Sequence, residues 1–249
     1  MHNRATMKRR LCAIGFLVLA ASSADAALVS RMSGQAYYDD ALDITWLADA
    51  NYAQTSGYDA DGLMTWPAAQ DWITSLNAAN HLGANGWRLP RVVDTGDPGC
   101  IVAYTGTDCG YNVDLATGEM AHLFYGTLGN TAYYDVNGMA TGCSGVSPYC
   151  LTNPGPFSNL QPHFYWTGTE VALHGSDSWY FRFAYGSQNY SQRSNEYYAW
   201  PVLDGDIGAV PEPAAVLQFP AALSVLVWLR RSIGGAKATR ESVDRRIPV

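Results

Sequence analysis

The clearest periodic pattern in the chain lies between residues 65 and 78. Thr65 is a good N-cap residue, and Pro67 follows in what would be the first helical turn. Apolar side chains then recur at the helical spacing i, i+3, i+4 and i+7, at Ala69, Trp72, Ile73 and Leu76. The pattern predicts an amphipathic helix that ends at the glycine-containing stretch 81–86.

Period-two alternation predicts strands on both sides of this helix. Residues 34–51 are rich in aromatic and β-branched residues and predict strands joined by an acidic turn at Asp39 and Asp40. Three late segments alternate large aromatic and polar residues, which predicts three half-buried antiparallel strands at 164–172, 176–191 and 196–205. The Gly- and Pro-rich stretch before them predicts long loops, with a short helix around residues 119–125.

The first 26 residues have the three parts of a secretory signal peptide. Four basic residues precede a short apolar run, and Ala24 and Ala26 supply the small side chains of a cleavage site. The run is shorter than the roughly 20 apolar residues that a membrane-spanning helix needs. We therefore predict export, with a mature chain that begins at Ala27 and a folded domain over residues 27–208.

The C-terminal stretch 209–231 combines an extended joint, an apolar run and a basic pair. Proline fixes φ and removes a backbone donor, so an exposed joint is expected at Pro211, Glu212 and Pro213. Residues 214–229 form a short, marginal membrane span. A basic pair, Arg230 and Arg231, would hold the next end of the chain on the cytoplasmic side of the inner membrane.

This order of features resembles the PEP-CTERM sorting signal of Gram-negative bacteria. The resemblance implies that an exosortase recognises the Pro-Glu-Pro motif and acts at or near it. Residues 232–249 extend past the basic pair and form a basic cytoplasmic tail. The alternative is a permanent single-span anchor, and either reading places the domain in the periplasm, at the cell surface or in the extracellular matrix.

The net charge of the part predicted to be exported, residues 27–212, limits which partners are expected. Residues 27–212 contain five arginines, no lysine and 19 acidic residues, which gives a net charge of −14 with neutral histidines. Such a surface repels phosphates and sulfated polymers, so nucleic acid is excluded as an expected partner. Cations, neutral polysaccharides and surface proteins remain.

The cysteines of the exported part form an even set, Cys100, Cys109, Cys143 and Cys150. Four cysteines allow three connectivities, and the short separations favour two local disulfides, Cys100 with Cys109 and Cys143 with Cys150. An oxidising compartment makes disulfides the expected state. A zinc site is the alternative, but the CxxC spacing of common zinc sites is missing.

Four short motifs resemble the Lcl C-terminal domain family, a C-type-lectin-like module. An early strand carries Asp43 to Leu47 with Trp46, and the chain after the helix reads Trp87, Arg88, Leu89 and Pro90. Two late strands carry the other motifs, at Tyr165 and Trp166 and at Trp179. The resemblance implies an α+β fold with a twisted antiparallel sheet, one or two helices and long disulfide-pinned loops; it implies no chemistry.

Candidate chemistry is sparse. The histidines at 81, 122, 163 and 174 show no metal-binding spacing, and no GxSxG nucleophile motif occurs, so no catalytic residue and no metal ligand is predicted. Acidic turns at 59–62, 135–138 and 204–206 could offer oxygen ligands to calcium, although turn formation explains them equally. For Arg88, an ion pair with Asp43 or Asp71 in the core is expected rather than a binding role.

The aromatic content is the best indication of a ligand. Adjacent tyrosines, at 37–38, 133–134 and 197–198, would present one ring to each face of a strand and could stack on sugars. We therefore expect a non-enzymatic binding or structural module associated with exopolysaccharide. A lectin-like enzyme related to formylglycine-generating enzymes is the alternative, and it would need a free reactive thiol.

Overall fold

The computed structural model describes residues 27–96, 107–143, 146–172 and 174–208. The predicted signal peptide, Cys100, the sorting segment 209–231 and the tail 232–249 lie outside these residues. Within the described part of the chain, no helix has the length and apolar character needed to cross a membrane. The fold described below is therefore that of the domain between the two ends.

The first sheet joins the beginning and the end of the domain. Its strands are β1 (Leu28–Arg31), β2 (Ala36–Asp39), β3 (Ile44–Leu47) and β8 (Val202–Asp204), in the antiparallel order β1-β2-β3-β8. The acidic turn is confirmed, since Asp39 ends β2 and its Oδ1 accepts hydrogen bonds from the backbone N–H groups of Ala41 and Leu42. β1 was not predicted from the sequence.

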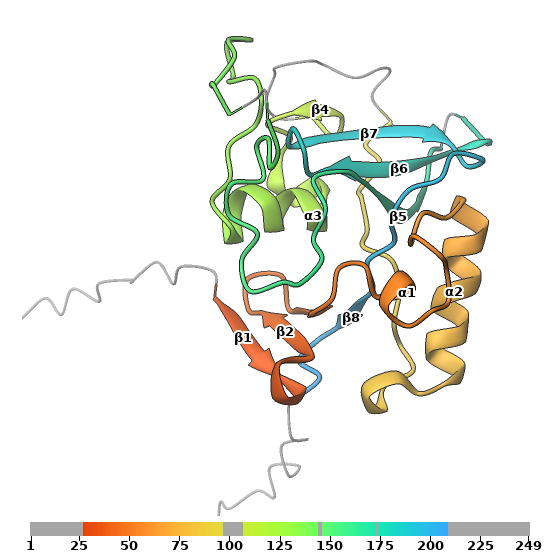
Figure 1. The fold of residues 1–249 in the computed structure, drawn as a ribbon. Coiled ribbons are helices and arrows are strands. Elements are labelled where there is room, and N and C mark those ends of the chain that lie inside the picture. The colour runs from red at the N-terminus through yellow and green to blue at the C-terminus, as the bar shows by residue number, and fades with distance from the viewer. Residues whose placement is uncertain (1–26, 97–106, 144–145, 173, 209–249) are drawn as a thin grey trace, which may run out of the picture. The chain divides into compact units, whose positions relative to one another are not determined.

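A second sheet contains the late strands. It is built from β4 (Gly110–Tyr111), β7 (Ser187–Gln192), β6 (Asp177–Arg182) and β5 (Phe164–Glu170), in the antiparallel order β4-β7-β6-β5. Figure 1 shows the two sheets at opposite ends of the domain. The expectation of a single sheet was therefore wrong, while the α+β class with antiparallel strands is confirmed.

The segment 176–191 is a hairpin rather than one strand. β6 and β7 pair along their whole length, from Asp177 with Gln192 to Arg182 with Ser187. The turn between them contains Gly186 at φ +64°, where a Cβ atom would lie 2.6 Å from Cε1 of Phe124. Only glycine combines this backbone conformation with so close a neighbour, so the turn is fixed by packing against the helical segment below it.

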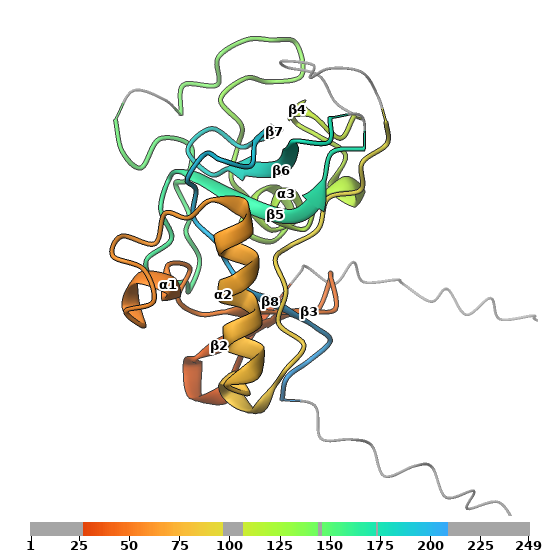
Figure 2. The same ribbon diagram turned by 90° about the vertical axis from the view of Figure 1, so that its right-hand side faces the viewer.

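One long helix and several short turns complete the domain. The predicted helix is α2 (Trp66–Ala78), with Thr65 as N-cap and Pro67 in its first turn. The short helix predicted around 119–125 is α3 (Glu119–His122), which continues as one π-helical turn, Leu123–Thr127. The sequence analysis missed α1 (Tyr52–Thr55) and the 3₁₀ turns at Met32–Gly34, His81–Gly83 and Leu115–Thr117. Figure 2 shows α2 running from the level of β5 to that of β2.

Aromatic side chains fill the space between the sheets. Trp46 and Trp200 pack with ring centroids 4.8 Å apart, and both are fully buried together with Trp72 and Trp166. Two of their indole groups are hydrogen-bonded within the core: the Trp200 Nε1–H donates to the Leu47 carbonyl at 2.7 Å, and that of Trp166 to the Met64 carbonyl at 2.9 Å. These tryptophans build the core and offer no face to a ligand.

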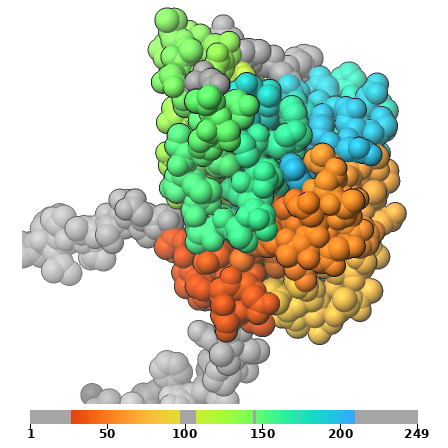
Figure 3. All heavy atoms as spheres, in the orientation of Figure 1, coloured from red at the N-terminus to blue at the C-terminus, as the bar shows by residue number. Residues whose placement is uncertain are grey.

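Loop segments cover one side of this core. The backbone N–H of Ala50 donates to the Ser158 carbonyl at 2.9 Å, which ties the segment after β3 to the segment before β5. On the face drawn in Figure 3, the green segment accordingly lies against the red N-terminal strands and the orange region of α1. The chain leaves these loops at Phe164, where β5 begins.

Candidate functional site

The Trp87-Arg88-Leu89-Pro90 motif links α2 to both sheets. Trp87 is buried, its Nε1–H donates to the His81 carbonyl at 3.0 Å, and Asn77 on α2 bonds both its N–H and its C=O. Leu89 is buried, and the Pro90 carbonyl accepts from the Gly168 N–H on β5 at 2.8 Å. The motif therefore fixes the course of the chain between the helix and the strands.

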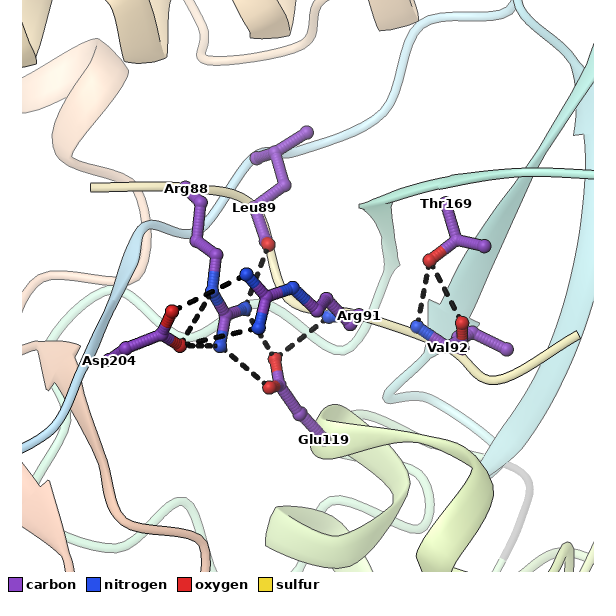
Figure 4. Close-up of polar contacts among 7 residues, drawn as sticks. All are labelled: Arg88, Leu89, Arg91, Val92, Glu119, Thr169 and Asp204. Atoms are coloured by element: carbon purple, nitrogen blue, oxygen red, sulfur yellow. Dashed lines mark hydrogen bonds and ion pairs between the residues drawn. The ribbon is translucent and has the colours of Figure 1, made fainter. Parts of the chain in front are cut away.

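Arg88 lies at the centre of an ion-pair cluster, drawn in Figure 4. Its Nη1 and Nη2 atoms each lie 2.7 Å from a carboxylate oxygen of Glu119, and its Nε lies 2.9 Å from Oδ1 of Asp204. Arg91 also contacts Asp204, and its backbone N–H donates to Glu119 at 2.8 Å. Arg88 is thus held by two carboxylates from different elements.

The predicted partners of Arg88, Asp43 and Asp71, were wrong. Asp43 accepts a hydrogen bond from the Tyr38 hydroxyl at 2.9 Å, and Asp71 lies on the exposed face of α2. A β-bridge between Arg88 and Val202 brings the arginine to β8 instead, and so to Asp204. The hydrogen bond from Arg88 holds the pKa of Asp204 below its usual value of 3.8. With its charge matched inside the protein, Arg88 has a structural role.

The other family motifs also point inward. Tyr165 and Trp166 on β5 are fully buried, and Trp179 on β6 is buried beside Val92. The Tyr165 hydroxyl accepts from the Gln161 N–H at 2.8 Å, and burial raises the pKa of this phenol. These side chains therefore serve packing within the domain.

The acidic turns use their carboxylates within the loops. Asp59 accepts from the Gly62 N–H at 2.7 Å, and Asp135 accepts from the N–H groups of Asn137 and Met139, both at 2.8 Å. These hydrogen bonds lower the pKa of Asp135. Across the described ranges, no group of three or more His, Cys, Asp or Glu side chains is placed to hold a metal ion.

The candidate histidines stand against different parts of the domain. His81 packs on Tyr52, with a centroid separation of 4.7 Å, and burial lowers its pKa. His174 stacks on Tyr190 and His163 lies edge-on to Phe164, while His122 is the last residue of α3. His81, His163 and His174 therefore contact different aromatic partners and are not gathered at one site.

A solvent-accessible hollow of about 390 Å³ lies where β5 begins and β6 ends. Aromatic rings dominate its wall, contributed by Tyr149, Phe164, Tyr185 and Tyr198. Arg182 and His163 also line it, and no Asp or Glu among the described residues does. We call this site the aromatic hollow; its volume falls within the range of small-ligand pockets.

Strand register explains how the hollow is assembled. Phe164 on β5 pairs directly with Arg182 on β6, which places the guanidinium carbon 4.7 Å from the Phe164 ring centroid. Tyr185, in the turn after β6, covers the guanidinium from a second ring at 3.9 Å. Burial, together with the nearby positive charge of Arg182, lowers the pKa of His163, which favours a neutral imidazole at pH 7.

A disulfide fixes the remaining wall of the hollow. Cys143 and Cys150 are bonded, as predicted, and the Cys150 N–H donates to the Ala184 carbonyl at 2.9 Å. Tyr149 is thereby held edge-on to Tyr185, with ring centroids 5.8 Å apart. Cys109 is also disulfide-bonded, and its predicted partner, Cys100, lies outside the described residues.

A second hollow, of about 220 Å³, lies near α1. Asp49 lines it, but both of its carboxylate oxygens accept from the Asn159 amide at 3.0 Å. With its charged group already engaged by the protein, this smaller hollow is the weaker candidate.

Sequence reasoning found part of the aromatic hollow. Of the predicted tyrosine pairs, Tyr198 lines the hollow, and the ring of Tyr133 packs on that of Tyr185 with a centroid separation of 5.2 Å. Tyr197 instead packs inward on Trp166, and the pair at 37–38 belongs to the first sheet. Arg182 and Tyr149 were missed. One available signal was that Arg182 is among only five arginines in residues 27–212.

The chain forms a small α+β domain with two antiparallel sheets and few helices, and its motif residues pack in the core. Its disulfide is typical of an extracytoplasmic protein. A family model described as "Lcl C-terminal domain" matches residues 35–203, and the chain belongs to this family. No curated protein and no solved structure matches the chain.

Proposed function

We propose that this chain is an exported, non-enzymatic surface or matrix protein whose C-type-lectin-like domain binds saccharides in the aromatic hollow. The observation behind the proposal is the ring of Tyr149, Phe164, Tyr185 and Tyr198 around a cavity of about 390 Å³. Aromatic rings present flat apolar faces, while tyrosine hydroxyls supply polar contacts at the edge. Pyranose rings, with C–H faces and hydroxyl rims, complement both features.

The state of the cysteines supports a binding role over the enzymatic alternative. A thiol enzyme of the formylglycine-generating type needs an unpaired cysteine, whereas Cys109, Cys143 and Cys150 are all disulfide-bonded. In the described wall of the aromatic hollow, the titratable groups are Arg182, His163 and tyrosines.

Export is supported by the same disulfide, because such bonds persist in oxidising compartments outside the cytoplasm. Delivery to the surface by an exosortase acting at Pro211, Glu212 and Pro213 belongs to the proposal and rests on the sequence pattern. An exopolysaccharide layer is the environment in which a saccharide-binding domain sorted in this way would work. A calcium requirement is not part of the proposal, since the acidic turns engage their carboxylates in backbone hydrogen bonds.

The binding proposal is tested by titrating the full-length protein with neutral and acidic oligosaccharides by isothermal titration calorimetry. Tyr149→Asn removes one wall ring at a position with φ +60°, a conformation that asparagine tolerates. Saccharide affinity should fall about tenfold, a typical effect of losing one stacked ring. Tyr58→Asn is the control, because Tyr58 is an exposed tyrosine outside the hollow. Equal affinities in both variants, or no saccharide binding by the unchanged protein, would contradict the proposal.

A further inference from the structure

Arg182 differs from every other arginine in the domain. Four arginines form ion pairs: Arg31 with Asp206, Arg88 with Glu119 and Asp204, Arg91 with Asp204, and Arg193 with Glu170. Arg182 pairs with no carboxylate of the described chain, although acidic residues in residues 27–212 outnumber arginines by 14. A half-buried cation that no described carboxylate neutralises, in so acidic a protein, indicates that its partner comes from outside.

The surroundings of Arg182 orient its guanidinium for such a partner. Phe164 and Tyr185 lie over the group, with distances of 4.7 and 3.9 Å from the guanidinium carbon to the ring centroids. These rings pack on the guanidinium, whose five N–H donors lie in one plane along its edge. The Arg193 guanidinium, by contrast, donates to the Asp177 carbonyl and the Ser178 hydroxyl, and no comparable acceptor faces Arg182 among the described residues. A planar edge of parallel donors matches the two oxygens of a carboxylate.

The electric field of the domain limits how much negative charge the ligand can carry. The exported part carries a net charge of −14, which repels densely charged polymers over a distance of about one Debye length, ~8 Å at physiological salt. Inside the aromatic hollow the local balance reverses, since Arg182 is present and no described acidic side chain lines the wall. A single carboxylate among neutral groups fits both conditions.

We propose that the aromatic hollow binds a uronic acid unit of an otherwise neutral polysaccharide, with the sugar carboxylate paired to Arg182. This inference rests on the proposed saccharide-binding function and adds the ligand class. The rings of Tyr149 and Tyr198 would take the sugar ring, while Arg182 binds the carboxylate; Phe164 already stacks on Tyr197 and contacts the Arg182 guanidinium. A peptide C-terminus has the same carboxylate, but proteins commonly capture it with backbone N–H nests, and the donors here belong to a side chain beside flat rings.

The test uses a tetrasaccharide that contains one glucuronate, and the same tetrasaccharide with its carboxyl group reduced to a hydroxymethyl group. Calorimetry with the full-length protein should give at least a tenfold preference for the acidic form, equivalent to about 1.4 kcal/mol. Arg182→Gln should abolish the preference and leave the weaker neutral binding. Arg182→Lys should restore part of it, because lysine keeps the charge without the bidentate edge.

Arg91→Gln is the matched control, since it removes the same charge from an exposed arginine outside the hollow, and it should keep the full preference. If Arg182→Gln unfolds the domain, NMR of the Arg182 Nε–H during titration of the unchanged protein replaces it, and a shift caused by the acidic tetrasaccharide alone is expected. Equal binding of the two tetrasaccharides overturns this inference and leaves saccharide binding intact. Binding of neither overturns the proposed function, and tighter binding of a short peptide with a free carboxylate overturns the choice of a sugar.

Discussion

Two arginines show how differently one residue type can be surrounded in the same domain. Arg88 is surrounded by Glu119 and Asp204, so its charge is neutralised as the chain folds. Arg182 is surrounded by rings, which attract the cation through their faces but accept no strong hydrogen bond along its edge. The sequence marks Arg88 through a recognisable motif and marks Arg182 by nothing local. The residue with the more conspicuous motif is therefore the structural one.

Removing Arg88 should destabilise the domain. Arg88→Met leaves Glu119 and Asp204 without their shared partner, and the side chains of Arg88 and Glu119 are only 16% and 17% exposed. Hydrogen bonds to charged groups contribute about 1.5–3 kcal/mol, so urea denaturation should show a loss of roughly 2–3 kcal/mol in the free energy of unfolding. Arg91→Met, at a side chain 59% exposed, should cost less than about 1 kcal/mol. Equal losses would show that Arg88 is not the centre of the cluster.

The same cluster predicts a measurable titration. Arg88 holds the pKa of Asp204 below 3.8, first through its hydrogen bond to the carboxylate. A carboxyl group with a lowered folded-state pKa stabilises the fold at pH values above its unfolded pKa, and this stabilisation is lost as the pH falls through the folded pKa. NMR titration should therefore place the Asp204 pKa below 3.8, and Arg88→Met should move it upward. An unchanged Asp204 pKa in that variant would contradict the assigned cause.

At the scale of elements, the sequence predicts what a regular period can encode. The 13 residues of α2 show a full amphipathic period and a capped start, so the helix was predicted correctly. The β6–β7 hairpin was read as one strand because its turn, Phe183 to Gly186, contains aromatic residues in place of the usual polar turn residues. The order of the strands in the sheets could not be predicted from the sequence either. Nothing local pairs β8 with β3, and this pairing is what divides the strands into two sheets.

The aromatic hollow depends on the same kind of long-range information. Phe164 and Arg182 meet because of the register of β5 with β6, and a register cannot be read from either strand alone. Tyr149 reaches the hollow because the Cys143–Cys150 disulfide holds its loop against Ala184. The cysteine spacing predicted this bond, but the position of the loop in space required the fold. The sequence therefore predicted that aromatic side chains could bind a ligand, but it did not predict where in the fold they meet.

The disulfide loop should matter for both stability and binding. Replacing both cysteines, Cys143→Ala and Cys150→Ala, opens a loop that closes over a separation of seven residues. Chain entropy for so short a loop corresponds to about 2–3 kcal/mol of stability, within the 5–15 kcal/mol typical of a domain. Saccharide affinity should fall severalfold at a temperature where the variant is still folded, because Tyr149 loses its anchor. Calorimetry and urea denaturation of the same sample separate the two effects, and unchanged affinity would remove the loop from the binding site.

At the scale of the whole molecule, charge and location are linked. The exported part has no lysine, and most of its arginines are occupied by internal ion pairs, so its outer surface is strongly acidic. A high net charge of this kind favours solubility, and it repels anionic polymers and membranes. The aromatic hollow carries a positive charge on an otherwise acidic domain. Under the proposal, a ligand gains electrostatic attraction only where its carboxylate reaches Arg182. A domain of this kind suits a mixed neutral and acidic polysaccharide layer outside the cell.

The sorting proposal predicts the mass of the finished protein. If a signal peptidase cuts after Ala26 and an exosortase acts near Pro211, Glu212 and Pro213, the protein recovered from its host should begin near Ala27 and end near Glu212. Intact-mass spectrometry should find this species only when the exosortase is present, and deletion of the enzyme should leave a longer form in the membrane fraction. Replacing Glu212 with Gln within the motif tests the same step in unmodified cells. A species that retains Val249 in both strains would contradict sorting and support a permanent anchor, in which the saccharide-binding domain stays tethered to the inner membrane and meets its ligand in the periplasm.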